Sequence, residues 1–90
     1  MRIVFDSAKD KLNLASHGLS LGLARELEWD EALVWVDDRF GYDELRLIGL
    51  APMGERLYYI AFVDHEDTRR VISLRYAERR EVKHYVQNYP

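Results

Sequence analysis

The sequence predicts an α+β domain, in which helices precede an antiparallel sheet and a last helix closes the chain. Three observations support this fold class: helical periodicity near the N-terminus, four later segments with the composition of strands, and a return of helical periodicity after Tyr76. At 90 residues the chain can bury one hydrophobic core but not two. We therefore expect a single domain over residues 1–90.

The N-terminal part is expected to contain a short strand and two helices. Residues 2–5, RIVF, have the composition of a strand. Asp6 or Ser7 can cap the helix that follows, because a side-chain oxygen there accepts a free backbone N–H. That helix should end at Gly18, and a second helix should begin after the cap residue Ser20.

Four segments rich in β-branched and aromatic residues follow: 32–38, 44–51, 56–65 and 69–76. Short runs that contain Asp, Gly or Pro separate them, as is typical of turns. Connections this short join antiparallel neighbours. The four segments are therefore expected to form an antiparallel sheet.

From Ala77 the apolar residues change to a helical spacing. They lie at positions i, i+3, i+4 and i+7, namely Val82, Tyr85, Val86 and Tyr89. Such a stripe is typical of a helix that packs on a core with one side. We expect this helix to bury Val82 and Tyr85. Arg79 and Arg80 should then point outward.

Positive charge is concentrated at the C-terminal end of a chain that is acidic overall. The formal net charge is −3. Residues 69–90 hold six basic and two acidic residues, a charge of +4, whereas residues 1–68 hold seven basic and fourteen acidic residues, a charge of −7. An acidic total disfavours indiscriminate nucleic-acid binding, but this polarity suits a local anion-binding surface.

Composition excludes several kinds of protein. The chain has no cysteine, so disulfides and thiolate metal sites are excluded. The apolar runs are too short for a membrane span, and the charge at Asp6 interrupts any signal-peptide core. We expect a cytoplasmic protein. His17, His65 and His84 should lie on separate elements, so neither a metal site nor another cofactor is expected.

Alternation along two strands predicts a cationic surface, because successive side chains of a strand point to opposite faces. In the segment 69–76, the face assigned to the core consists of Arg70, Ile72, Leu74 and Tyr76. The polar face consists of Arg69, Val71, Ser73 and Arg75. In the segment 44–49, the polar pair opposite the leucines is Glu44 and Arg46. If the two strands join one sheet, four polar side chains come within reach of one another: Glu44, Arg46, Ser73 and Arg75.

Such a cluster suits the binding and cleavage of a phosphodiester. Arginine forks pair with phosphate oxygens and stabilise transition-state charge, and a nearby carboxylate can take the proton of an attacking 2′-hydroxyl. The alternative is a solvated sheet face in which Glu44 and Arg46 form an ordinary ion pair. The same alternatives, phosphate contacts or a solvated face, apply to the basic residues of the terminal helix: Arg79, Arg80 and Lys83. Glu81 and Tyr85, four residues apart, should meet on that helix.

Three motifs in this sequence resemble those of the BrnT family of type II toxins. The first, D-x-x-K-x-x-x-N-x-x-x-H-G-x-S-x-x-x-A, is matched by Asp6, Lys9, Asn13, His17, Gly18, Ser20 and Ala24. The second, E-x-R-x-I-G, is matched by Glu44, Arg46, Ile48 and Gly49. The third, R-x-I-S-x-R-x-A-x-x-x-E, is matched by Arg70, Ile72, Ser73, Arg75, Ala77 and Glu81. The motifs occur in the family's order, and together they cover nearly the whole chain.

The resemblance implies a RelE-like fold and a metal-independent endoribonuclease that cleaves RNA and inhibits translation. It also implies a neutralising ribbon-helix-helix antitoxin, similar to BrnA, whose complex with the toxin binds operator DNA. The residues expected to be catalytic are Glu44, Arg46, Arg75 and Glu81. With the basic helix included, those expected to bind substrate are Arg70, Ser73, Arg79, Arg80, Lys83 and Tyr85. Lys9 and His17 are further candidates.

The chain departs from the family's pattern at Ser7, where proline is usual, and at Leu21 and Gly22, where a larger apolar residue and an acidic residue are usual. Its acidic total is also unusual for an enzyme that must hold polyanionic RNA. The alternative function is a non-catalytic protein-binding module of the same fold. A DNA-binding helix–turn–helix pair is disfavoured, because the second helix would bring acidic side chains to phosphate. These are Glu26, Glu28, Asp30 and Glu31.

Overall fold

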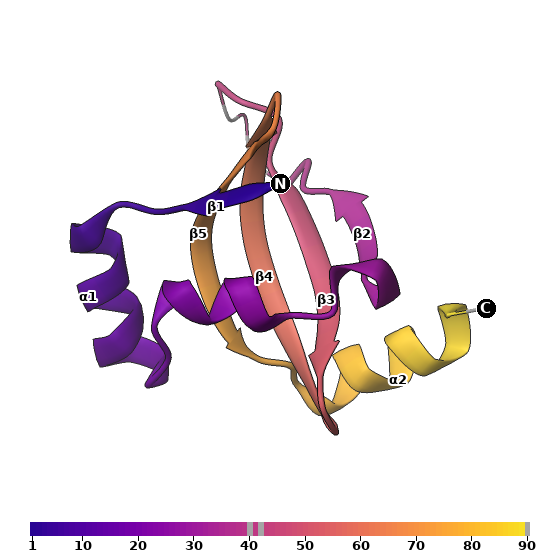
Figure 1. Ribbon diagram of the computed structural model, residues 1–90. Coiled ribbons are helices and arrows are strands. Elements are labelled where there is room, and N and C mark those ends of the chain that lie inside the picture. Colours follow the sequence, from indigo (N-terminus) through magenta and orange to yellow (C-terminus); the bar gives the residue numbers. More distant parts are fainter. Residues whose placement is uncertain (40, 42, 90) are drawn as a thin grey trace.

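The computed structural model describes residues 1–39, 41 and 43–89. In chain order its elements are β1 (Arg2–Val4), α1 (Ser7–His17), the 3₁₀ helices η1 (Leu21–Glu26) and η2 (Trp29–Glu31), β2 (Leu33–Val36), β3 (Leu47–Met53), β4 (Arg56–His65), β5 (Thr68–Tyr76) and α2 (Arg79–Asn88). One sheet contains all five strands in the order β1-β5-β4-β3-β2 (Figure 1). The predicted α+β class is confirmed. The sheet is mixed rather than antiparallel throughout, because β1 pairs in parallel with β5 at one edge.

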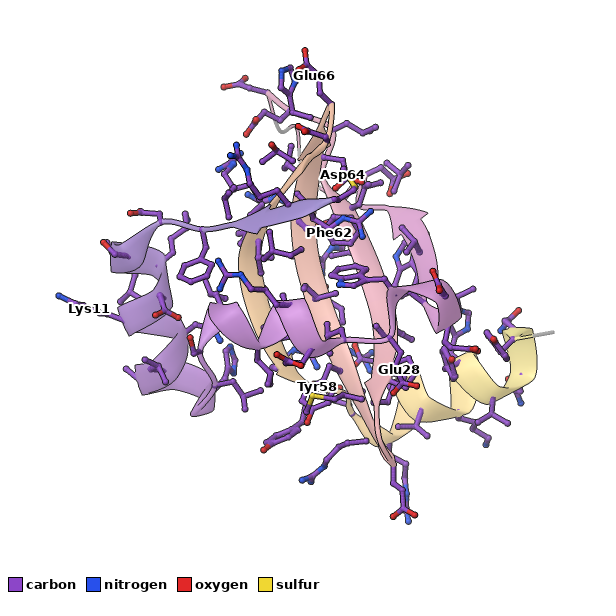
Figure 2. All side chains as sticks on the ribbon, in the orientation of Figure 1. Lys11, Glu28, Tyr58, Phe62, Asp64 and Glu66 are labelled. Atoms are coloured by element: carbon purple, nitrogen blue, oxygen red, sulfur yellow. The ribbon has the colours of Figure 1, made fainter. Side chains whose placement is uncertain are left out.

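The helix α1 begins and ends where the sequence predicts. An Asp6 carboxylate oxygen accepts a hydrogen bond from the Ala8 N–H at 3.3 Å. At the other end Gly18 has a φ of 73°, in the left-handed region, and its N–H donates to the Leu14 carbonyl at 2.9 Å. Figure 2 shows Lys11 on the side of α1 that points away from the sheet.

Asn13 attaches α1 to the sheet. It is buried, and its amide nitrogen donates to the Leu74 carbonyl at 2.7 Å and to the Leu19 carbonyl at 2.9 Å. Its amide oxygen accepts the Leu74 N–H at 3.0 Å. Since β1 pairs only with residues 68–70 of β5, Asn13 provides the hydrogen bonds that a neighbouring strand would otherwise supply to Leu74.

The second predicted helix is a 3₁₀ helix, η1, rather than an α-helix. Ser20 caps it as expected, accepting the Gly22 N–H at 3.1 Å. Leu21, Ala24 and Leu27 are all buried, and a spacing of three residues places them on one side of a helix with three residues per turn. Gly22 also weakens the intrinsic preference for an α-helix. The core-facing pattern therefore favours the tighter helix.

The core lies between η1 and the sheet. Nine buried residues form it: Leu21, Ala24, Leu27, Ala51, Tyr58, Ile60, Phe62, Val71 and Leu74. Figure 2 shows Phe62 and Tyr58 on the side of the sheet that η1 crosses. Trp29 covers one end, with its ring centroid 5.2 Å from that of Phe62 in an edge-on arrangement. We call this side of the sheet the core face.

A β-bulge between β4 and β5 changes which side chains reach the core face. Ala61 pairs with Ser73 and Phe62 pairs with Val71, so Ile72 is an extra residue without a partner in β4. The strict alternation that the sequence predicts for 69–76 is therefore wrong. On the N-terminal side of the bulge, Arg69 and Val71 lie on the core face and Arg70 lies on the opposite face. On its C-terminal side, Ser73 and Arg75 lie on the same face as Arg70.

The opposite face is partly covered by α2. Ile48 and Leu50 are buried there, on the side where the Tyr85 hydroxyl of α2 donates to the Glu31 carbonyl at 2.6 Å. His84 of α2 contacts Trp35 of β2, with ring centroids 5.8 Å apart. The prediction that α2 buries Val82 is wrong, because Val82 is 41% exposed. Neither helix in the described part of the chain has the length and apolar character needed to cross a bilayer.

Candidate functional site

The register of the sheet places the arginines of two sequence motifs on one surface. Side chains of cross-strand partners share a face. Val63 of β4 pairs with Arg70, Ala61 with Ser73, and Tyr59 with Arg75. Arg46 immediately precedes Leu47, the partner of Phe62, so it lies in the row of Val63 and Arg70. We call the surface formed by Arg46, Arg70, Ser73 and Arg75 the arginine face.

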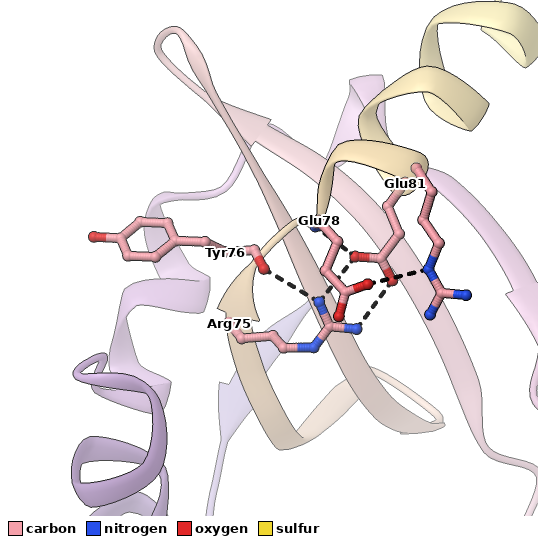
Figure 3. A network of polar contacts seen from close by, with 5 residues as sticks. Arg75, Tyr76, Glu78 and Glu81 are labelled. Carbon is pink, nitrogen blue, oxygen red and sulfur yellow. Dashed lines mark hydrogen bonds and ion pairs between the residues drawn. The ribbon is translucent and has the colours of Figure 1, made fainter.

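Arg75 is the most firmly held residue of the arginine face. Its two terminal nitrogens donate to the two carboxylate oxygens of Glu81, at 2.8 and 2.9 Å. One of these nitrogens also donates to the Tyr76 carbonyl at 3.2 Å, and the guanidinium carbon lies 3.9 Å from the centre of the Tyr59 ring. Figure 3 shows the carboxylate of Glu81, at the start of α2, against the end of the Arg75 side chain.

The first turn of α2 fixes Glu81 in this position. The Glu78 N–H donates to a Glu81 carboxylate oxygen at 2.7 Å. This hydrogen bond is one half of a capping box, in which the cap residue and the third helical residue exchange side-chain-to-backbone hydrogen bonds. Glu78 also accepts a hydrogen bond from the Arg80 Nε at 3.1 Å. The Glu81 carboxylate therefore both stabilises the start of α2 and orients Arg75.

The pair is charged at neutral pH. Burial by itself raises the pKa of Glu81, but the hydrogen bonds from Arg75 and from the Glu78 N–H, together with the positive charge of Arg75 and Arg80, outweigh it, so the pKa of Glu81 is lowered. The hydrogen bond to Glu81 raises the pKa of Arg75, against the effect of burial. A carboxylate stabilised in this way is a weak proton acceptor, and in the structure it holds Arg75 in place.

The carboxylate of Glu44 contacts a different arginine from the one expected. Glu44 forms an ion pair with Arg70, two strands away in the sheet. Both side chains are substantially exposed, at 59% and 40%, so both remain accessible to a ligand. At this end of the face the carbonyl of Arg46 accepts the Asp37 N–H at 2.8 Å, which attaches the residue to the end of β2.

The two ends of the arginine face are separated along the strands. The rows of Arg70 and Arg75 are four positions apart along β4, at Val63 and Tyr59, a distance of about 13 Å. Ser73 occupies the middle row. The structure thus pairs Glu44 with Arg70 and Glu81 with Arg75. The three arginines of the face lie around Ser73 but do not converge on one point.

The basic residues of α2 lie beside this face. Arg79, Arg80 and Lys83 are exposed, and Arg80 forms an exposed ion pair with Glu78. Tyr85 is less available, since its hydroxyl is bound to Glu31. Burial raises the pKa of Tyr85, and the charges of Glu31 and Glu28 raise it further.

The two other candidate residues, Lys9 and His17 of α1, line a separate hollow of about 200 Å³. Its lining residues are Lys9, Leu12, Asn13, Ser16, His17, Ile72 and Ser73. Lys9 and His17 lie one turn to either side of Asn13, and Ser73 belongs to both the hollow and the arginine face. The polar surface therefore continues from β5 to α1.

Sequence reasoning missed Tyr59 and Trp35. Both line a hollow of about 240 Å³ together with Ile48 and Glu81. The segment 56–65 is predicted as a strand, but its sequence alone does not show that Tyr59 shares a face with Arg75. Tyr59, Ala61 and Val63 are alternate residues of β4 and therefore share a face. Their pairing with Arg75, Ser73 and Arg70 depends on the bulge in β5, which the sequence does not reveal.

Within the described residues, no group of three or more His, Cys, Asp or Glu side chains is arranged to hold a metal ion. His17 ends α1, His65 ends β4, and His84 lies on α2. His84 shares an exposed hydrogen bond with Asn88 at 3.1 Å and contacts Trp35. The histidines thus lie on separate elements.

Two comparisons with known proteins identify relatives of this chain. The family described as the ribonuclease toxin BrnT of type II toxin–antitoxin systems matches residues 5–81. Among solved structures, the chain is similar to the ribonuclease toxin BrnT of Brucella abortus, known from a crystal structure at 1.1 Å resolution. The TM-score is 0.67 with 25% sequence identity, over 88% of this chain and 99% of that one. A search of curated proteins gives no match.

Proposed function

The chain belongs to the BrnT family of ribonuclease toxins of type II toxin–antitoxin systems, and we propose that it cleaves RNA on the arginine face without a metal ion. One observation carries this proposal. Arg75 is fixed by both oxygens of Glu81 and by the Tyr59 ring, while its face also holds Arg46 and Arg70. A preoriented guanidinium among further cations supplies the charge that a phosphoryl transition state requires.

In the proposed reaction the 2′-hydroxyl of a ribose attacks the adjacent phosphorus. The bond from phosphorus to the 5′ oxygen of the next nucleotide breaks, and that oxygen takes a proton from solvent, leaving a 2′,3′-cyclic phosphate and a 5′-hydroxyl. Arg75 binds a non-bridging oxygen of the scissile phosphate, Ser73 donates a hydrogen bond to it, and the long side chain of Arg46 reaches toward it from the other end of the face. The two guanidinium groups replace the electrostatic role of a metal ion.

The two carboxylates have different proposed roles. Glu44 is exposed and paired with Arg70, so it can take the proton of the 2′-hydroxyl or orient Arg70. Glu81 is a positioning residue, since its lowered pKa and its three hydrogen bonds keep it charged and bound to Arg75.

The flanking phosphates of the RNA extend to both sides of the arginine face. The basic residues of α2, Arg79, Arg80 and Lys83, bind phosphates on the flank next to Arg75, and Arg70 binds them at the opposite end of the face. Lys9 and His17, at the hollow beside Ser73, bind phosphates on the side of α1. Two acidic side chains on this surface, Glu44 and Glu81, are held in ion pairs with Arg70 and Arg75, and the neighbouring cations can attract the RNA phosphates.

The proposed setting of the reaction is the cytoplasm, where cleavage of messenger RNA inhibits translation. The proposed partner is a ribbon-helix-helix antitoxin similar to BrnA, which neutralises the toxin and brings the complex to operator DNA. Membership in a family of type II toxins supports a protein antitoxin. The ribbon-helix-helix type follows from the resemblance of the three sequence motifs.

The test is cleavage of a short RNA by purified protein in EDTA. Wild type should cleave it and leave cyclic phosphate ends. Arg75→Ala should lower the rate by about a hundredfold or more, the usual loss when one donor to the transition-state charge is removed. The matched control is Arg56→Ala. Arg56 also stacks on a tyrosine, 4.1 Å from the centre of the Tyr76 ring, but on the core side of the sheet.

Two results would contradict the proposal. Equal activity of wild type and Arg75→Ala would remove Arg75 from the reaction. Loss of all activity in EDTA, with recovery on adding Mg²⁺, would show that the reaction depends on metal. If neither cleavage nor growth arrest occurred with wild type, the non-catalytic protein-binding module would become the better description.

A further inference from the structure

The helix α2 presents an apolar stripe that the described structure leaves partly exposed. Val82 is 41% exposed, Val86 69% and Tyr89 38%. In an α-helix successive residues are about 100° apart, so these three side chains fall within about 60° of one another around the helix. Glu81 and Tyr85, which contact the rest of the molecule, lie to one side of them. The stripe is therefore on the flank of α2, facing solvent.

Basic residues border the stripe on its outer side. Arg79 and Lys83 follow Val86 around the helix, and they are exposed. Neither has a hydrogen-bond or ion-pair partner among the described residues. Tyr89 stacks on Tyr85 with ring centroids 5.1 Å apart, which holds the inner border of the stripe in place. The surface thus runs from aromatic through aliphatic to cationic.

We propose that this surface, formed by Val82, Val86, Tyr89, Arg79 and Lys83, binds an amphipathic acidic helix of the cognate antitoxin. The inference rests on the proposed function only in taking the neutralising partner to be a protein. A helix with a stripe of aliphatic residues and carboxylates along one border matches both parts of the surface. RNA would satisfy the cations but leave the valines exposed. A second copy of α2 offers the valines, but both oxygens of its carboxylate, Glu81, are already bound to Arg75.

Occupancy of this surface would oppose RNA binding directly. Arg79 and Lys83 are proposed contacts for flanking phosphates, so the antitoxin and the RNA compete for them. The covered helix also carries Glu81, which orients Arg75. Neutralisation is therefore competitive, and the proposed antitoxin helix need not enter the arginine face itself.

The experiment measures the affinity of purified toxin variants for the purified product of the adjacent antitoxin gene by calorimetry. Val82→Ser/Val86→Ser removes the apolar stripe without altering charge. We expect its Kd to rise by about tenfold or more, with RNA cleavage by the free toxin unchanged. The matched control is Val34→Ser/Val36→Ser on the edge strand β2, where the valines are 43% and 49% exposed. This control should retain wild-type affinity, and thermal unfolding should show that both variants are folded.

The other outcomes would overturn the inference. Unchanged affinity in Val82→Ser/Val86→Ser, or an equal loss in the β2 control, would place the antitoxin elsewhere. Loss of RNA binding with intact antitoxin affinity would assign the stripe to RNA. A change from dimer to monomer in the absence of antitoxin would assign it to self-association. Because affinity is measured without RNA, failure here is distinguishable from failure of the cleavage proposal, which Arg75→Ala tests.

Discussion

At the residue scale, the carboxylate of Glu81 links local structure to the proposed chemistry. It accepts the Glu78 N–H at the start of α2 and both terminal nitrogens of Arg75. Only 14% of its side chain is exposed. Loss of this charge should therefore affect both the stability of the fold and the orientation of the arginine.

The variant Glu81→Gln tests both effects. It should lower the free energy of unfolding at pH 7 by about 2 kcal/mol, since hydrogen bonds to a charged group are lost, and slow RNA cleavage by about tenfold. Because the folded-state pKa of Glu81 is lowered, its contribution is fully present above the ordinary value of 4.5 and is lost as the pH falls through the folded-state pKa. Urea unfolding across this range should show the two proteins converging in acid.

The control is Glu66→Gln, which alters an exposed carboxylate in the β4–β5 turn. Its stability should track wild type at every pH. A constant difference between Glu81→Gln and wild type down to pH 3 would show that the carboxylate does not titrate as the structure implies.

Sequence motifs alone did not separate binding residues from residues that organise the fold. Asn13 belongs to the same motif as Lys9 and His17, and all three lie at helical spacing. The three line the same hollow, but Asn13 is buried and bound to the Leu74 backbone, whereas Lys9 and His17 are exposed. Only the partner across space distinguishes them, and a single sequence does not contain it.

At the element scale, the bulge at Ile72 determines which arginine reaches which face. Without the extra residue, one half of β5 would slip by one position, and every side chain in that half would change faces. Arg70 would then point toward Phe62, and Val71 toward solvent. The bulge thus allows a strand to contribute both Arg70 and Arg75 to one surface.

Deletion of Ile72 should prevent cooperative folding. The slipped strand would bury an arginine without a partner and remove Val71 from the core, a loss of more than about 4 kcal/mol. Circular dichroism during heating should show no sharp transition. Ile72→Ala keeps the extra residue and should unfold cooperatively, within about 2 kcal/mol of wild type. A cooperative transition at the wild-type temperature in the deletion variant would contradict this account.

Elements defined by caps were predictable, and those defined by packing were less so. Asp6, Gly18 and Ser20 act through hydrogen bonds or dihedral angles within a few residues, so the sequence identified all three. The bulge depends on the pairing of β5 with β4. The exposure of Val82 depends on how α2 meets β2 and η2, since an amphipathic pattern indicates an apolar side but not what lies against it.

At the scale of the whole molecule, charge is distributed so that one side can meet RNA. The formal charge is −3, yet the arginine face and the outer border of α2 carry the basic residues of the last motif. Binding at such a surface depends on release of counterions from the phosphates that it contacts. The dependence of RNA affinity on salt concentration therefore reports the number of phosphate contacts.

The affinity for a non-cleavable single-stranded RNA, with deoxyribose at the cleavage site, should fall with salt. A plot of log affinity against log salt concentration should have a slope of about −2 to −4, corresponding to roughly three to five phosphate contacts. Arg79→Ala/Lys83→Ala should reduce the slope by about 1 to 1.5. Arg56→Ala, on the core side, should leave it unchanged. A slope near zero for wild type would mean that the arginine face does not bind phosphate.

The parallel pairing of β1 with β5 joins two segments that are synthesised at different times. Residues 2–4 are synthesised before their partners at 68–70, which follow more than sixty residues later. At a synthesis rate of roughly 5–20 residues per second, β1 waits several seconds for its neighbour. Arg70, Arg75 and Glu81 lie in that same later stretch. A chain interrupted before residue 68 therefore lacks both the partner of β1 and the complete set of arginines, so a toxic activity on the arginine face would begin only after residue 81 is made.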